Sequence, residues 1–328
     1  MPLVPRALTI AREDGVRTLF RKGRAHGLSV IGATLADGVQ RLNRIRYRAT
    51  GGETRITDAD WDDLILLDGC RYDQFERLHT LGGDVESRVS VGSATPEFLE
   101  RTFANETCFD TVYVTANPMY RHVGLDDVFH AVIDVWRSDW DEERKTVWPE
   151  AMVEATHEAH QTYPNKRVLT HFMQPHYPFL GETGREIAHS GFEWSKRLVG
   201  DGESSRDDPT VWTLASAGRI DEDTVRVAYD ENLQLVMPHV AELVDSTDGR
   251  TIVTADHGNL IGERIAPLDG RRYGHPRETY IDGLRKVPRL VIEGTRRRQI
   301  EAEPPGEEAE IDRSTVRDRF ADFGYLDP

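Results

Sequence analysis

The sequence predicts an α/β fold, in which a doubly wound, mostly parallel sheet is flanked by helices. Two observations support this prediction: short apolar segments alternate with longer amphipathic ones, and several of the apolar segments end in Asp or His. With 328 residues, of which 38% are hydrophobic, the chain can bury a sizeable core. Ligands bind at the carboxyl ends of the strands in such sheets. The residue that follows each apolar segment is therefore a candidate functional residue.

The apolar segments predict buried parallel strands, and the periodic segments predict helices. The expected strands are Leu64–Leu67, Thr111–Thr115, Val168–Phe172, Thr251–Thr254 and Leu290–Ile292. The expected helices are Pro96–Phe103, Pro149–Tyr163 and Asp223–Val244.

The composition is acidic, arginine-rich and poor in lysine, with five lysines among 41 basic residues and a net charge of −16. Such a composition is typical of a protein from a very salty cytoplasm, because carboxylates keep the surface hydrated where salt screens charge. The negative charge argues against nucleic acid as a partner. Two cysteines, Cys70 and Cys108, provide neither a disulfide framework nor a Cys-rich zinc site. Without a recognisable signal peptide or spanning segment, the expected location is the cytoplasm.

The first 52 residues form a separate, basic region. Residues 1–50 carry ten Lys/Arg and three Asp/Glu, a net charge of +7. Apolar spacing predicts two amphipathic helices, split near Gly23–Gly27 and followed by a turn at Gly51–Gly52. We expect this arm to lie on an anionic surface, either a membrane, at its periphery, or the acidic body of this protein or of a second copy. Salt weakens lipid attraction more than apolar docking, so docking on protein is favoured.

The remainder divides into residues 53–295, the expected catalytic domain, and residues 296–328, an acidic tail. The tail is polar, with a short amphipathic helix expected around Val316–Phe323. We expect it to be an ordinary solvated C-terminus.

Three apolar segments lead into residues that bind metals. Asp68 follows one strand, Asp256 and His257 follow another, and His176 lies shortly after a third. Carboxylate oxygen and imidazole nitrogen suit Mg²⁺, Mn²⁺, Ca²⁺ or Zn²⁺, and the glycine after His257 lets the backbone approach an ion closely. A lone acid at a strand end is more often a cap, but three such ends together indicate a metal site.

Four segments resemble the alkaline phosphatase/sulfatase superfamily, which includes sulfatases, phosphoglycerate mutases and phosphoethanolamine transferases. TADHGNLIGE (254–263) resembles its Asp-His-Gly signature, and LILLDGCRYDQF (64–75) resembles its first strand. THFMQPHYPF (170–179) and YGHPRETYIDGLRKVPRLVI (273–292) are similar to two later sulfatase segments. The four segments occur in family order and span most of the chain. The resemblance implies the alkaline phosphatase-like version of the fold.

The resemblance also implies roles for individual residues. It makes Asp68, Asp256 and His257 the ligands of one divalent metal ion, and His176 and His275 the groups that bind the ester's charged oxygens or protonate the leaving oxygen.

Three further residues match the family segments less sharply. Arg71 and Asp73 lie in the first segment, where an ion pair at a helix start is the alternative explanation. His171 lies before His176, where a buried, hydrogen-bonded histidine is the alternative.

The expected nucleophile lies in the segment SVGSATPEFLERTF (90–103), a Gly/Ser loop that leads into a helix. The superfamily places Ser, Thr or a formylglycine at a helix start near the metal, where the dipole and the metal activate it. Thr95 is the favoured nucleophile and the natural N-cap, with Pro96 at the first helical position. Ser93 is its rival.

Two departures from the family narrow the chemistry. Neither cysteine is followed by the sulfatase maturation signature, so a formylglycine sulfatase is not expected. Asp230 and His239 do not have the spacing of a two-metal site, so we expect one ion, with a second ion assisted by His176 and His275 as the alternative.

The expected function is metal-dependent hydrolysis of a phosphate or sulfate ester, through a covalent Thr or Ser intermediate. Transfer of a phospho-alcohol to a glycan or lipid, and binding without catalysis, are the alternatives. The expected partner is a small-molecule, glycan or lipid ester. Peripheral membrane contact or self-association would use residues 1–50.

Overall fold

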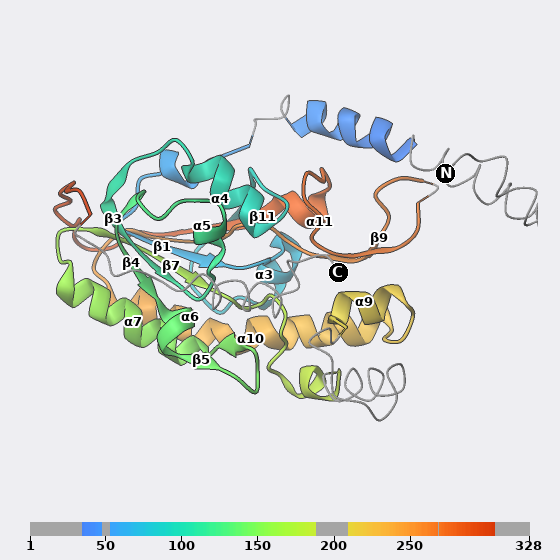
Figure 1. The fold of residues 1–328 in the computed structure, drawn as a ribbon. Coiled ribbons are helices and arrows are strands. Elements are labelled where there is room, and N and C mark those ends of the chain that lie inside the picture. The colour runs from blue at the N-terminus through green and yellow to red at the C-terminus, as the bar shows by residue number, and fades with distance from the viewer. Residues whose placement is uncertain (1–34, 48–52, 188–208, 268, 306–328) are drawn as a thin grey trace, which may run out of the picture.

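A computed structural model describes residues 35–47, 53–187, 209–267 and 269–305. A seven-stranded sheet forms the centre, in the order β2-β11-β8-β1-β7-β3-β4 (Figure 1). Its strands are β1 (Asp63–Leu67), β2 (Val85–Val89), β3 (Cys108–Thr115), β4 (Phe129–Asp134), β7 (Arg167–Phe172), β8 (Thr251–Ala255) and β11 (Lys286–Ile292). The mostly parallel sheet flanked by helices is the predicted fold.

The remaining elements connect and cover these strands. The helices are η1 (Ile56–Asp58), α3 (Tyr72–Leu78), α4 (Thr95–Phe103), α5 (Met119–His122), α6 (Val135–Ser138), α7 (Pro149–Thr162), α9 (Val211–Ser216), α10 (Glu222–Ser246) and α11 (Asp282–Arg285). The described residues also include helical segments over 35–47 and 182–187. Two small ribbons pair β5 (Trp140–Asp141) with β6 (Thr146–Val147), and β9 (Leu260–Glu263) with β10 (Arg272–Gly274).

Strand β1 lies at the centre of the sheet, where all five of its residues are buried and the last four are apolar. Its side chains alternate between the two faces. Leu64 and Leu66 belong to the core beneath α4 and α5, whereas Ile65 and Leu67 belong to the core covered by α7 and α10. In Figure 1 these two helix layers lie on opposite sides of the sheet.

One predicted strand runs in the opposite direction. β11 pairs antiparallel with both β8 and β2, so the expectation of a parallel strand at Leu290–Ile292 was wrong. A parallel strand needs a crossover that returns the chain to the amino-terminal end of the neighbouring strand. Here the chain leaves the carboxyl end of β8 and forms β9, β10 and α11. It then enters β11 at that same end of β8, so the two strands run antiparallel, with Arg289 opposite Thr254.

The start of the C-terminal region packs on the body, contrary to the expected solvated tail. Arg297 pairs with Asp60 and Asp62, and Arg298 pairs with Asp63. The remainder of the tail, with the helix expected at Val316–Phe323, lies outside the described residues. So do the first arm helix and the turn expected at Gly51–Gly52. None of the described helices is both long and apolar enough to cross a bilayer.

Candidate metal centre

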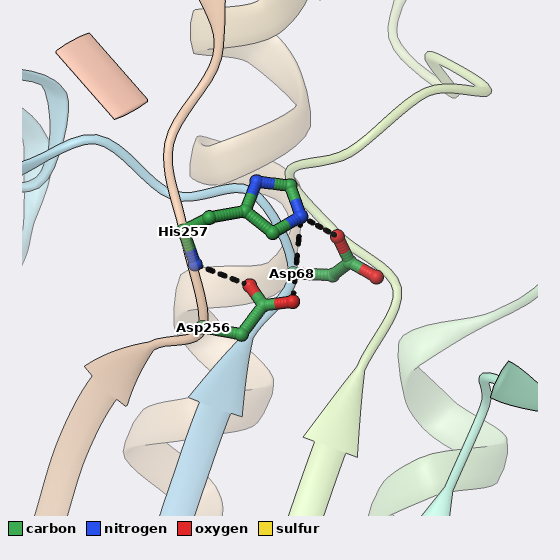
Figure 2. A group of neighbouring side chains, drawn as sticks. All are labelled: Asp68, Asp256 and His257. Atoms are coloured by element: carbon green, nitrogen blue, oxygen red, sulfur yellow. Dashed lines mark hydrogen bonds and ion pairs between the residues drawn. The ribbon is translucent and has the colours of Figure 1, made fainter. Parts of the chain in front are cut away.

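The sheet register brings two acidic residues side by side. β1 and β8 are parallel neighbours, and Leu67 lies opposite Ala255. The residues that follow, Asp68 and Asp256, therefore leave the same edge of the sheet together, and both are fully buried. The next residue along, His257, is also fully buried and points between the two carboxylates (Figure 2).

The three side chains form a compact set of metal donors. Among the described residues, Asp68, Asp256 and His257 each offer a ligand atom within 4.8 Å of the other two. The Nε2 atom of His257 lies 3.6 Å from Asp68 Oδ1 and 3.4 Å from Asp256 Oδ2. Donors arranged tetrahedrally about 2.0–2.1 Å from one ion lie about 3.3–3.4 Å apart. The observed spacing therefore fits one ion in the centre.

The hydrogen bonds behind these atoms point their lone pairs at the same space. Nδ1 of His257 donates to the carbonyl of Gly258 over 2.8 Å, so a neutral imidazole leaves its Nε2 lone pair facing the carboxylates. Asp256 Oδ1 accepts from the amides of Gly69 and His257, which leaves Oδ2 toward the centre. Facing lone pairs repel one another unless a cation lies between them, so this donor set fits a divalent ion.

The glycine after His257 is also required by its packing against a neighbouring backbone. A Cβ at Gly258 would lie 2.3 Å from the carbonyl oxygen of Gly283. The amide of Gly258 also donates to the carbonyl of Leu284 over 2.8 Å. Glycine is thus required at position 258, where α11 packs against the loop that carries Asp256 and His257.

The hydroxyl of Thr95 faces the centre of this donor set. Oγ1 donates to Asp256 Oδ2 over 2.7 Å, and lies 3.3 Å from Asp68 Oδ2 and 3.1 Å from His257 Nε2. The expectation that Thr95 caps its helix was wrong. Ala94 occupies the N-cap position, and no side chain caps the helix. Thr95 is the first residue of α4, and its hydroxyl bonds the carboxylates instead.

The rival Ser93 is hydrogen-bonded elsewhere. Its hydroxyl lies 2.7 Å from Glu97 Oε2 and 2.9 Å from the carbonyl of Pro276, and it accepts from the amide of Thr279. Glu97 in turn forms a buried ion pair with Arg285, with 2.8 Å between Oε1 and Nη2. Ser93 therefore joins the loop before α4 to the loop that carries His275.

The two predicted histidines lie beside the donor set and contact each other. Nε2 of His176 and Nε2 of His275 are 2.8 Å apart. Nδ1 of His176 donates to the carbonyl of Tyr177, so a neutral His176 carries no proton on Nε2. The proton between the two Nε2 atoms therefore belongs to His275. The His275 ring centroid lies 4.8 Å from that of His257. Burial lowers the pKa of His176 to about 4 and lowers the pKa of His275 well below its ordinary value.

His171 is buried and hydrogen-bonded, which is the alternative considered for it, and it also lies beside the two carboxylates. It is fully buried, and Nδ1 shares a hydrogen bond of 2.7 Å with the hydroxyl of Tyr113. Its Nε2 has no hydrogen-bond partner and lies 4.0 Å from Asp68 Oδ2 and 3.9 Å from Asp256 Oδ2. Burial lowers the pKa of His171 to about 4, so the ring beside the two carboxylates is neutral.

Arg71 and Asp73 adopt the alternative considered for them, an ion pair at a helix start. Arg71 Nε lies 2.8 Å from Asp73 Oδ1, and the guanidinium also pairs with Glu263. Asp230 pairs with Arg77, as expected of a residue outside the metal site.

Asn117 was missed by the sequence analysis. It follows β3, and its Nδ2 donates to Asp68 Oδ2 over 2.8 Å from a fully buried position. The rule that found Asp68 could have found it, because Asn117 also lies just past the carboxyl end of a strand.

No family model and no curated protein matches the chain. Solved structures do match it. The soluble domain of lipooligosaccharide phosphoethanolamine transferase A from Neisseria meningitidis is 13% identical, with a TM-score of 0.47, over 73% of this chain and 78% of that one. The integral membrane form of that protein is 14% identical, with a TM-score of 0.48, over 87% of this chain. This chain spans 59% of that protein's length.

A third match is a protein in the alkaline phosphatase superfamily from Vibrio parahaemolyticus. It is 12% identical, with a TM-score of 0.36, over 75% of this chain and 63% of that one. This third neighbour is described as a member of the superfamily that the sequence motifs resemble.

Proposed function

We propose that this protein is a metal-dependent enzyme that cleaves phosphate or sulfate esters through a covalent intermediate on Thr95. The observation that carries the proposal is the position of the Thr95 hydroxyl, within 3.3 Å of both carboxylates and of His257. A threonine that served only its helix would cap it. This one begins α4, and its hydroxyl donates to the Asp256 carboxylate instead.

Asp68, Asp256 and His257 would hold the ion, and Thr95 would be its fourth neighbour. A bound divalent ion would lower the pKa of the hydroxyl and neutralise charge on the ester's oxygens. Asp256 accepts the hydrogen bond of the Thr95 hydroxyl and is placed to take its proton. Burial alone would raise the pKa of the Asp256 carboxyl, but His257, His171 and the Gly69 amide together lower it.

The bond changes follow from these positions. The Thr95 oxygen attacks phosphorus or sulfur while the bond to the leaving oxygen breaks. The leaving oxygen takes a proton from water, because the neutral ring of His275 would become an anion if it gave up its Nε2 proton. His176 and His275, whose Nε2 atoms are 2.8 Å apart, are instead placed to bind the ester's charged oxygens. Water or an acceptor alcohol then breaks the Thr95 ester. Hydrolysis and transfer differ only in this last step.

The test compares three substitutions at one position. Turnover of nitrophenyl phosphate, a bis-nitrophenyl phosphodiester and nitrophenyl sulfate is measured in high salt with Mg²⁺, Mn²⁺, Ca²⁺ or Zn²⁺. Thr95→Val and Thr95→Ala should lose at least about 10³-fold in kcat, whereas Thr95→Ser should keep much of it. Added glycerol as an acceptor distinguishes transfer from hydrolysis.

Calorimetric titration with the metal alone provides an independent readout. Asp256→Asn should abolish binding, while Thr95→Val should weaken it less. Full turnover in Thr95→Ala together with loss in Ser93→Ala would transfer the role to Ser93. Metal binding with no turnover of any substrate would leave a binding protein and refute the enzyme.

A further inference from the structure

The helix over residues 35–47 exposes an apolar stripe. Among the described residues, four large hydrophobic side chains are strongly exposed, and three of them are on this helix: Leu35 at 45%, Leu42 at 68% and Ile45 at 64%. At about 100° per residue, Leu42 and Ile45 lie on one face, with Leu35 close to it. Scattered exposed hydrophobic residues need no explanation, but three on one short helix form a surface.

The opposite face of the helix is already docked on the protein through polar and aromatic contacts. Asn43 Nδ2 donates to the carbonyl of Tyr280 over 2.7 Å, and Gln40 Oε1 accepts from the amide of Tyr280. Tyr47 is buried, and its hydroxyl donates to Asp282 at the start of α11. The helix therefore contacts the start of α11 through Tyr47. Its exposed apolar side chains lie on the face away from these contacts. Figure 1 shows the helix above the body of the protein.

Arginines border the stripe on both sides. Arg41 and Arg46 are exposed and lie on either flank of Leu42 and Ile45 around the helix. Arg44 stacks over the Tyr280 ring at 5.7 Å. A cleft of about 300 Å³ between helix and body is lined by Asp37, Gln40, Arg41, Arg44, Arg101, Glu278 and Tyr280. Apolar side chains bordered by long cations match the boundary between acyl chains and anionic headgroups.

We propose that the face formed by Leu35, Leu42 and Ile45, with Arg41 and Arg46, is a docking surface for an anionic lipid membrane. Charge complementarity favours this occupant. The arm of residues 1–50 has a net charge of +7 in a chain of −16, so the arm attracts the surface that the acidic body repels. The docked helix contacts Tyr280, which lies five residues after His275 in the sequence.

This inference does not depend on the proposed reaction. The full chain is sedimented with vesicles of phosphatidylcholine, with and without a third of phosphatidylglycerol, at increasing NaCl. Wild type should pellet with the anionic vesicles only. Leu42→Glu/Ile45→Glu should lower the vesicle affinity at least about tenfold. Val227→Glu is the matched control, because Val227 is 48% exposed on α10, and it should bind as wild type does.

Two further measurements separate the contributions. Arg41→Gln/Arg46→Gln should flatten the salt dependence, while the apolar contribution persists in high salt. Hydrolysis of a soluble ester and the melting temperature should be the same in all these variants as in wild type. Equal pelleting of the Leu42→Glu/Ile45→Glu protein, or equal binding to neutral vesicles, would overturn the proposal. So would a dimer in light scattering that this double variant dissociates, because the stripe would then bind a second copy.

Discussion

Replacing Glu97 by Gln should destabilise the protein strongly, although Glu97 does not belong to the metal donor set. Its carboxylate is 1% exposed and pairs with the fully buried Arg285 over 2.8 Å. Oε2 also accepts from the amides of Ser93 and Glu278 and from the Ser93 hydroxyl. Glu97 thus holds together the loop that leads to Thr95 and the loop that follows His275.

The magnitude follows from these partners. Removing one member of a buried ion pair costs about 3–5 kcal/mol, because the other charge is left without compensation. Arg285 keeps a second carboxylate, that of Glu53 at 2.7 Å, and glutamine keeps an acceptor for the Ser93 amide. We therefore expect the free energy of unfolding to fall by about 2–3 kcal/mol, or the melting temperature by roughly 3–4 °C for a chain of this size.

The loss should depend on pH in a defined direction. Burial alone would raise the pKa of Glu97, but Arg285 and the Ser93 and Glu278 amides bring it below its ordinary value of 4.5. A group whose pKa is lowered by folding stabilises the protein above its unfolded pKa. The difference between wild type and Glu97→Gln should be complete above about pH 4.5 and shrink as pH falls toward the folded pKa.

The assay is urea unfolding at pH 7 and at pH 4, with Glu100→Gln as the matched control. Glu100 is on the same helix, but its ion pair with Arg277 is half exposed, so its loss should stay within about 0.5–1 kcal/mol. Equal losses in the two variants would refute the reasoning. Turnover of Glu97→Gln should also fall, because the loop that Glu97 holds through Ser93 leads directly into Thr95.

Three further predictions concern other parts of the chain. Gly258→Ala should lower the free energy of unfolding by about 1–3 kcal/mol and weaken metal binding in calorimetry, because its Cβ would meet the Gly283 carbonyl at 2.3 Å. An unchanged metal affinity would show that the loop can move to accommodate the Cβ. Asp63→Asn should lower the free energy of unfolding in urea by about 2–3 kcal/mol, because the buried Asp63 carboxylate pairs with His160 and Arg298. The control Asp60→Asn, on the surface, should lower it by less than about 1 kcal/mol. Burial raises the pKa of the Cys70 thiol, so Cys70 should react with a thiol reagent only after denaturation, and rapid native labelling would contradict its burial.

Much of the sheet could be predicted because its central strands are short and apolar. β1, β7 and β8 were expected within a residue of their observed bounds, since both faces of each strand are covered. β2 was missed because it is an edge strand with one buried residue, Arg88, so its sequence VESRV shows no apolar run. The direction of β11 was missed because a short apolar segment does not indicate at which end of the sheet the chain enters the strand.

The candidate site was predictable where it follows strand ends and unpredictable where it depends on distant pairs. Asp68, Asp256 and His257 were found from position alone, and the structure places them together. The Glu97–Arg285 pair joins residues 188 positions apart, and no periodicity in one sequence indicates such a contact. The role of Gly258 depends equally on a distant backbone, that of Gly283.

The site shows why a sheet of this type needs such distant pairs. Parallel register brings Asp68 and Asp256 together, but two buried carboxylates repel each other in a low dielectric. The backbone amides on Asp256 fix one carboxylate, and Asn117 fixes the other. Thr95 comes from a different segment, so its hydroxyl can face the pair only if the loop before α4 is held as firmly. The buried Glu97–Arg285 pair holds that loop, which is why the residues that support the site are as buried as the residues that form it.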